Sequence, residues 1–173
     1  MKLRLWDILK DNENSSLLYT HLIDWQNSLE NNRGERAKLK RKKNPLEVYL
    51  SEDFRRGIVH TLVNNNFDFN ESSLERLALP VGLLAHAKSV DSESSFATVF
   101  AKTARGSKDM MDVRFRKLLS ISDTDHDAFY VTLIRLTRLA DDKLGFKNFL
   151  WGTCFWNDMS RRIWAKQYYL VEK

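Results

Sequence analysis

The chain has 173 residues, with 28 Lys and Arg against 23 Asp and Glu, a net charge of +5 and a single cysteine. A chain of this length can bury about 70% of its unfolded surface, so its core needs neither metal nor disulfide. The lone Cys154 excludes an internal disulfide, and the longest uncharged apolar stretch, residues 77–85, is far shorter than the roughly 20 residues of a membrane-spanning helix. Residues 1–6 lack the pattern of a secretory leader. We therefore expect a cytoplasmic protein without a membrane partner.

Apolar residues recur at intervals of three and four along the chain, which is the period of the α-helix. In the first half, Ser72 and Glu75 form a capping-box pattern at a helix start, and Pro80 is expected to kink or end that helix. The helices predicted for this half lie at residues 17–32, 51–63, 72–84 and 96–104, with a polar loop at residues 64–70.

The second half has a more regular apolar pattern with short connectors. Its four predicted helices lie at residues 110–121, 125–142, 146–156 and 159–169. The predicted fold is all-α, a two-lobed helical bundle of about eight to ten helices. With no Gly/Ser hinge in the sequence, we place the boundary near Gly106, between an N-terminal lobe at 1–108 and a C-terminal lobe at 109–173.

Positive charge is concentrated in two parts of the chain. The basic segment, residues 33–43, contains seven basic side chains and one acid, Glu35, and the last third of the chain has a second excess of Lys and Arg. A clustered basic field favours phosphate polyanions such as nucleic acid. Taken alone, the basic segment is also compatible with a solvated charge run in a loop.

Signatures of catalysis are missing from the sequence. The glycines are isolated and form no phosphate-binding loop, and the single Cys154 lies among aromatic residues, which is typical of a small buried hydrophobe. Alternating acids at Asp123, Asp125 and Asp127 resemble a calcium loop, but the glycine and the glutamate that complete that pattern are missing. The histidines are also scattered singly, at His21, His60, His86 and His126. We therefore predict a protein that is not an enzyme and has no cofactor and no metal site.

Basic residues occur in pairs on the predicted helices of the second half. Arg135 and Arg138 are three residues apart, so they lie side by side, opposite the apolar row Phe129, Leu133, Leu136 and Ala140. Arg114 with Lys117, and Arg161 with Arg162, form two more pairs. Each pair alone is typical of a solvated face, but together with the basic segment they indicate a surface that contacts a phosphate backbone. Nearby aromatics could stack bases, although their helical spacing favours a core position: Trp151, Phe155, Trp156, Trp164, Tyr168 and Tyr169.

Three stretches resemble motifs of a known family. Residues 34–41, Gly-Glu-Arg-Ala-Lys-Leu-Lys-Arg, are similar to G-x-R-A-x-L-R-R, residues 114–119 are similar to R-F-x-x-L-L, and residues 164–169 are similar to W-A-R-x-Y-Y. Residues 133–136 resemble an L-R-x-L helix with the arginine one place later. In this order and spacing the chain resembles the CasB family, the small subunit of the type I-E CRISPR surveillance complex Cascade. It departs from the family pattern at Lys40, and at Gly152 and Thr153, where the family has an acidic pair.

The resemblance implies a non-catalytic, two-lobed helical subunit that works in antiviral defence. Its implied partners are guide RNA, target DNA with the displaced strand of the R-loop, the backbone and large subunits of Cascade, and a second copy of itself arranged head to tail. Motif matching points to Arg36, Lys40, Arg41, Arg114 and Arg135 as the residues that face nucleic acid. Together with the basic pairs, the predicted nucleic-acid-binding residues are Arg33, Arg36, Lys38, Lys40, Arg41, Lys42, Arg114, Arg116, Lys117, Arg135, Arg138, Arg161 and Arg162.

Two alternatives belong to other classes of protein. A stand-alone helical adaptor would use the same basic face to bind an acidic protein, and would not bind single-stranded DNA at low salt. An all-α DNA-binding regulator would need a helix-turn-helix reading helix with polar base-contacting residues, and no such helix is evident in the sequence.

Overall fold

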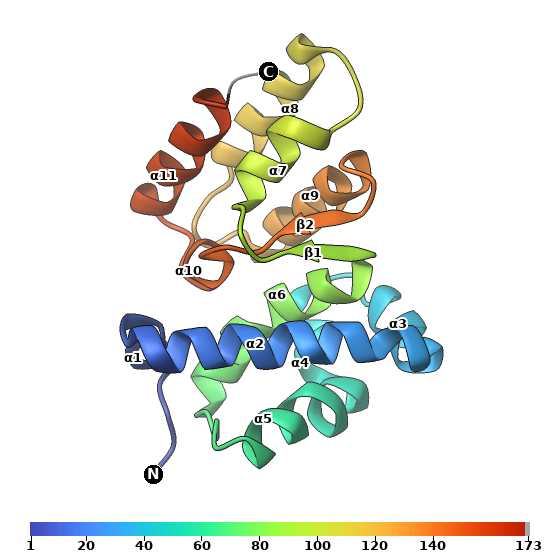
Figure 1. Ribbon diagram of the computed structural model, residues 1–173, viewed down its shortest axis with the longest axis vertical. Coiled ribbons are helices and arrows are strands. Elements are labelled where there is room, and N and C mark those ends of the chain that lie inside the picture. Colours follow the sequence, from blue (N-terminus) through green and yellow to red (C-terminus); the bar gives the residue numbers. More distant parts are fainter. Residues whose placement is uncertain (172–173) are drawn as a thin grey trace. The chain divides into compact units, whose positions relative to one another are not determined.

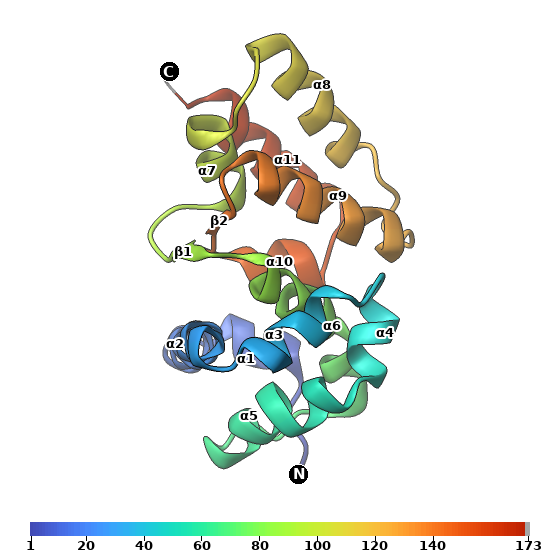
Figure 2. The same cartoon turned by 90° about the vertical axis from the view of Figure 1, so that its right-hand side faces the viewer.

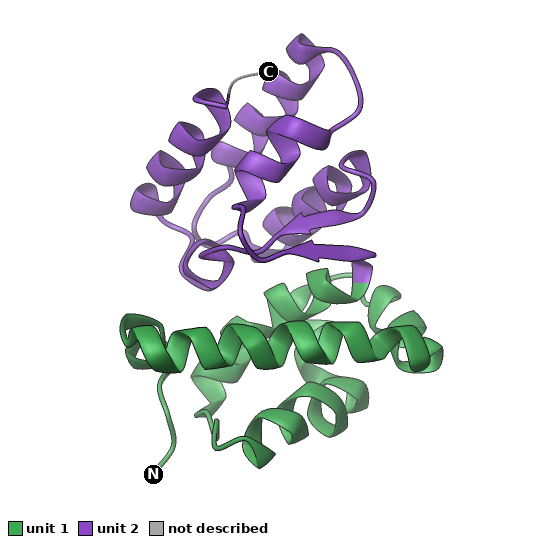
Figure 3. Ribbon diagram, viewed as in Figure 1, with its two compact units in different colours: residues 1–85 green, residues 86–173 purple. Residues whose placement is uncertain are grey.

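The structure is a computed structural model that describes residues 1–171 of the chain. Over these residues the chain consists mostly of helices, and its two β-strands are three residues long each (Figure 1). It divides into two compact units, one formed by residues 1–85 and one that begins at His86 (Figure 3). The predicted all-α fold is confirmed, with eleven α-helices in the described part of the chain.

The first unit is formed by two long helices, α2 and α6, and several short ones. Its core contains the fully buried side chains Leu18, Leu22 and Ile58. Its elements are α1 (Leu5–Lys10), α2 (Asn12–Ser28), the 3₁₀ turn η1 (Leu29–Asn31), α3 (Arg33–Lys40), α4 (Pro45–Leu50), the π-helical segment η2 (Phe54–Val59), α5 (His60–Asn64) and all but the last residue of α6 (Glu71–His86).

The two ends of α6 differ from the sequence prediction. The side chain of Asn70 accepts a hydrogen bond from the backbone N–H of Ser73 at 2.9 Å, so Asn70 and not Ser72 caps the helix, and the predicted capping box is wrong. The helix does not end at Pro80 but continues to His86. Proline removes one backbone hydrogen bond from a helix, and burial of the apolar residues on both sides of Pro80 outweighs that loss.

The second unit combines five helices with a small parallel sheet. The strands β1 (Ser89–Asp91) and β2 (Lys143–Gly145) pair in parallel, with Val90 opposite Leu144. Parallel strands cannot be joined by a tight turn, so the chain crosses from one to the other through three helices. The helices of this unit are α7 (Phe96–Thr103), α8 (Lys108–Leu119), α9 (His126–Leu139), α10 (Phe149–Cys154) and α11 (Asp158–Tyr169).

Aromatic side chains form much of the core of the second unit. The ring of Trp164 lies 5.2 Å from the rings of Phe96 and Trp156, measured between ring centroids, and all three side chains are buried. The prediction that the aromatic residues near the C-terminus belong to the core is therefore confirmed for Trp156, Trp164 and Tyr168. Trp151 and Phe155 are only half-buried, and Tyr169 has half of its surface exposed.

Gly152 on α10 allows the ring of Trp164 to approach the backbone closely. A Cβ atom added at Gly152 would lie 2.6 Å from ring atoms of Trp164, a separation so short that the buried ring or one of the two helices would have to shift. The glycine found where the family pattern has an acid thus has a packing reason in this chain. On the same helix, Cys154 is buried, which confirms the prediction of a small hydrophobe.

The domain boundary expected near Gly106 lies between α7 and α8, inside the second compact unit. Helix α7 lies beside α11 in both views and also packs on α9 and β2, which is why it groups with the second half of the chain (Figures 1 and 2). The division into lobes at residue 108 stays a prediction. Across residues 1–171, no helix combines the length and the apolar character that crossing a membrane requires.

Candidate nucleic-acid interface

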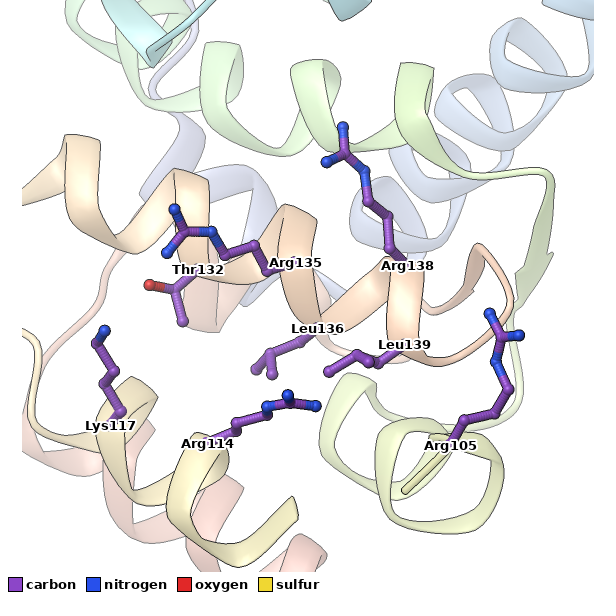
Figure 4. Close-up of a pocket in the computed structure, with 8 residues that line it drawn as sticks. All are labelled: Arg105, Arg114, Lys117, Thr132, Arg135, Leu136, Arg138 and Leu139. Carbon is purple, nitrogen blue, oxygen red and sulfur yellow. The ribbon is translucent and has the colours of Figure 1, made fainter. Parts of the chain in front are cut away.

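A cleft in the second unit is bordered by α8, α9 and the segment that follows α7 (Figure 4). Its volume is about 500 Å³. Leu136 and Leu139 of α9 lie in the middle of the view, with Arg114 of α8 on one side and Arg135 and Arg138 on the other. We call this the basic cleft, and its lining residues are Arg105, Arg114, Lys117, Thr132, Arg135, Leu136, Arg138 and Leu139.

Helix α8 supplies two cations of the basic cleft. The helix starts at Ser107, whose hydroxyl oxygen accepts a hydrogen bond from the N–H of the third helical residue at 3.2 Å. Phe115 and Leu118 are fully buried and fix the rotation of the helix about its axis. Arg114 is consequently half-buried at the edge of the buried face, and Lys117 lies one turn further along the same edge, exposed to solvent.

Helix α9 supplies the opposite wall of the cleft. Its N-cap is Asp125, whose carboxylate accepts a hydrogen bond from the backbone N–H of Ala128 at 3.1 Å and lies at the positive end of the helix dipole. Arg135 and Arg138 are both exposed, one turn apart. Burial of the predicted apolar row is confirmed for each of its members, although Leu136 also lines the cleft beside the arginines it was expected to oppose: Phe129, Leu133, Leu136 and Ala140.

Most cations of the basic cleft have no acidic partner among residues 1–171. Arg105 forms an ion pair with Asp141, with 3.1 Å between guanidinium nitrogen and carboxylate oxygen. None of the other four makes an ion pair with any residue in the described part of the chain; these are Arg114, Lys117, Arg135 and Arg138. A group of like charges at a partly enclosed surface concentrates anions from solution.

The structure brings together side chains that the sequence placed on two separate helices. The pair Arg114 and Lys117 and the pair Arg135 and Arg138 were predicted independently, and all four line one cleft. Arg105 was not among the predicted residues, because it follows α7 outside any periodic pattern. Its place at the cleft comes from a backbone hydrogen bond, at 2.9 Å, from its N–H to the carbonyl of Leu139.

Most of the basic segment forms a helix, α3, which ends at Lys40, and its last three residues follow the helix. Leu39 is fully buried beneath it, and the guanidinium of Arg36 donates a hydrogen bond at 3.0 Å to the carbonyl oxygen of Ala85 in α6. Glu35 accepts a hydrogen bond at 3.4 Å from the indole nitrogen of Trp25 in α2. Burial raises the pKa of the Glu35 carboxyl, while the hydrogen bond from Trp25 acts in the opposite direction.

These contacts leave most cations of the basic segment on the outer side of α3. Arg36 is half-buried and holds the helix against α6, so its predicted role in binding competes with a structural role. Lys42 is also half-buried. The exposed cations of the segment are Arg33, Lys38, Lys40, Arg41 and Lys43.

Comparison with known protein families gives a match to CRISPR-associated protein Cse2 over residues 35–169. The chain belongs to the Cse2 family. This is the CasB family, the small subunits of type I-E Cascade, as the sequence motifs indicated. No curated protein and no solved structure matches the chain. The matched region includes the whole basic cleft and almost all of the basic segment.

The family motifs supply both core and cleft in this Cse2-family chain. From residues 114–119, Phe115 enters the core, where its ring stacks on Tyr168 at 4.1 Å, and Arg114 lines the basic cleft. From residues 164–169, Trp164 and Tyr168 are buried. The phenol of Tyr168 donates a hydrogen bond at 2.7 Å to Asp112, and burial together with this contact raises its pKa. The aromatic motif residues therefore hold α8 and α11 together.

Arg161 occupies a different environment from the other predicted cations of this Cse2-family chain. Its guanidinium donates to the carbonyl of Leu119 at 3.0 Å and to that of Ile121, and it forms ion pairs with Asp123 at 2.6 Å and with Asp158 at 3.2 Å. Only 19% of the side chain is exposed. With its donors already engaged inside the fold, we leave Arg161 out of the interface proposed below.

Two further predicted cations are exposed but lie outside the cleft lining. Arg116 on α8 and Arg162 on α11 both face solvent. The acids that resembled a calcium loop have other uses, because Asp123 pairs with Arg161 and Asp125 caps α9. Within residues 1–171 no three His, Cys, Asp or Glu side chains gather as a metal site would require.

Proposed function

We propose that this chain acts as a non-catalytic small subunit of a type I-E Cascade complex and that it binds nucleic acid through the basic cleft and the outer side of α3. The observation that supports this proposal most is the gathering around one cleft of four cations that have no acidic partner in the described part of the chain. In this role the subunit contacts guide RNA, target DNA and the displaced strand, beside the backbone and large subunits and a second copy of itself.

Sequence-independent charge suits this task. Exchanging a DNA duplex for an RNA–DNA hybrid is nearly balanced in free energy, so modest contacts with the phosphate backbone can favour opening. Such contacts must work at every target, and Arg and Lys provide them because they read charge and not sequence. The cleft cations can contact phosphates of any sequence. They lie on two helices that the core holds in place.

The proposal predicts a steep salt dependence for binding of the full chain to single-stranded DNA. Each neutralised phosphate on a single strand contributes about −0.7 to the slope of log affinity against log salt, so four cleft contacts give a slope of about −2.8 or steeper. The measurement is fluorescence anisotropy of a labelled oligonucleotide over a salt series. A peptide nucleic acid with the same bases and no charge serves as control, and we expect it not to bind. Failure to bind DNA at low salt would favour the adaptor interpretation.

A second prediction concerns the single ion pair of the cleft. Asp141 neutralises Arg105 and adopts a left-handed backbone conformation with φ of 55°, which asparagine tolerates well. The substitution Asp141→Asn therefore keeps the backbone and frees Arg105 for a fifth phosphate contact. We expect the salt slope to become steeper by about 0.7 and the affinity at 0.1 M salt to rise about fivefold. An unchanged or weaker affinity in the same titration would show that Arg105 does not contribute to binding.

A further inference from the structure

The floor of the basic cleft is apolar, although its rim is charged. Leu139 is half-buried and Leu136 almost fully buried, and both contribute to the lining together with Thr132. In Figure 4 these leucines lie between the arginines of the two helices. The aliphatic stems of long cationic side chains extend such an apolar surface, while their charged ends reach into water.

Binding to phosphates alone does not need this arrangement. A backbone-contacting surface needs cations at suitable spacing, and an apolar recess between them gains nothing from a phosphate. A recess of about 500 Å³ is in the size range of pockets that bind small ligands. A flat apolar group that covers its apolar walls removes both surfaces from water, which favours binding. The ligand that fits both features has an anionic group next to an apolar ring.

We propose that the basic cleft accepts an unstacked nucleobase of a single strand, with the flanking phosphates held by Arg114 and Arg135. In a duplex the bases are paired and stacked inside the helix, so only phosphates reach the rim and the floor stays uncovered. The cleft therefore prefers single-stranded to double-stranded nucleic acid. This inference rests on the proposed function, and it adds that the cleft contacts a base as well as the phosphates.

The test compares three probes of equal length at one salt concentration: single-stranded DNA, an abasic strand with the same phosphates, and duplex DNA. A base seated on an apolar or stacking surface commonly changes affinity by a factor of about ten or more, so we expect the abasic strand to bind the full chain about tenfold more weakly than the normal strand. Equal affinity for the normal and abasic strands would overturn the inference and leave the proposed function intact. Failure of all three probes would overturn the proposed function itself.

A variant locates the effect in the cleft. Leu139→Gln makes the floor polar at a half-buried position with a side chain of similar volume, and we expect it to lower affinity for the normal strand to that of the abasic strand. Its affinity for the abasic strand should stay unchanged, because the rim cations are intact. Leu46→Gln is the matched control, since Leu46 is 61% exposed on α4 in the first unit. If Leu139→Gln discriminates between the strands as the unmodified chain does, the base does not sit on this floor.

Discussion

Replacing Gly145 with alanine is expected to lower the free energy of unfolding by about 3 kcal/mol, the upper part of the usual range for an overpacked site. Gly145 ends β2, and a Cβ atom there would lie 2.2 Å from the carbonyl oxygen of Ser95 and 2.8 Å from the backbone nitrogen of Phe96. The obstacle is backbone, which cannot turn aside as a flexible side chain can. Ser95 is also the N-cap of α7, because its hydroxyl oxygen accepts a hydrogen bond from the N–H of Thr98. The added methyl group therefore pushes β2 away from the start of α7.

Urea unfolding followed by circular dichroism measures this effect. The matched control is Gly34→Ala in α3, where nothing lies within 4 Å of the added Cβ. Alanine stabilises a helix relative to glycine by about 0.5–1 kcal/mol, so the control should shift the unfolding midpoint in the opposite direction. A midpoint for Gly145→Ala equal to that of the unmodified chain would contradict the close packing of β2 on α7.

The other large effect concerns the four cations of the basic cleft that pair with no acid within the described residues, changed together to glutamine. If each contacts one phosphate of a single strand, counterion release accounts for about 600-fold in affinity at 0.1 M salt, and the salt slope should fall by about 2.8. Glutamine keeps two methylene groups of each side chain and has a helix propensity close to that of Arg and Lys, so helix content should not change. The measurement is the salt series described above, and the changed residues are Arg114, Lys117, Arg135 and Arg138.

A control variant with the same loss of charge separates the cleft from the net charge of the chain. Lys2, Arg4 and Arg56 in the first unit are exposed and already paired with nearby acids, and Lys10 lies over the ring of Trp6. Changing these four to glutamine should alter affinity by no more than about twofold at 0.15 M salt, where distant exposed charges are screened. Equal losses in both variants would mean that nucleic acid responds to overall charge and that the cleft has no special role.

The helices that carry the cleft could be predicted from sequence because their apolar rows are long. Residues 110–121 and 125–142 were expected to be helical, and α8 and α9 occupy them with shifts of a few residues at the ends. The helix expected at residues 146–156 is shorter, because Asn148 adopts a left-handed conformation with φ of 56° and α10 begins after it. The local periodicity of apolar residues thus predicts that a helix is present, and tertiary packing determines the residues at which the helix begins and ends.

Other parts of the fold left little trace in the sequence. The basic segment has only one buried apolar residue, Leu39, so no period could be read from it, and its helix depends on contacts of Glu35 and Arg36 with distant elements. Three-residue strands are too short to show alternation. The packing of α8 against α9 also depends on long-range contacts. The basic residues could therefore be predicted from the sequence, but their position around one cleft could not.

The parallel pairing of β1 with β2 sets an order of events during synthesis. Helices α7, α8 and α9 all lie between the two strands, so the sheet closes only after Gly145 has left the ribosome. Long-range pairings of this kind form slowly, and until then the edge of β1 and the apolar side of α7 lack the strand that covers them. A chain that terminates before β2 thus retains both sides of the basic cleft in its sequence but presents an open edge to other chains, which makes aggregation its expected fate.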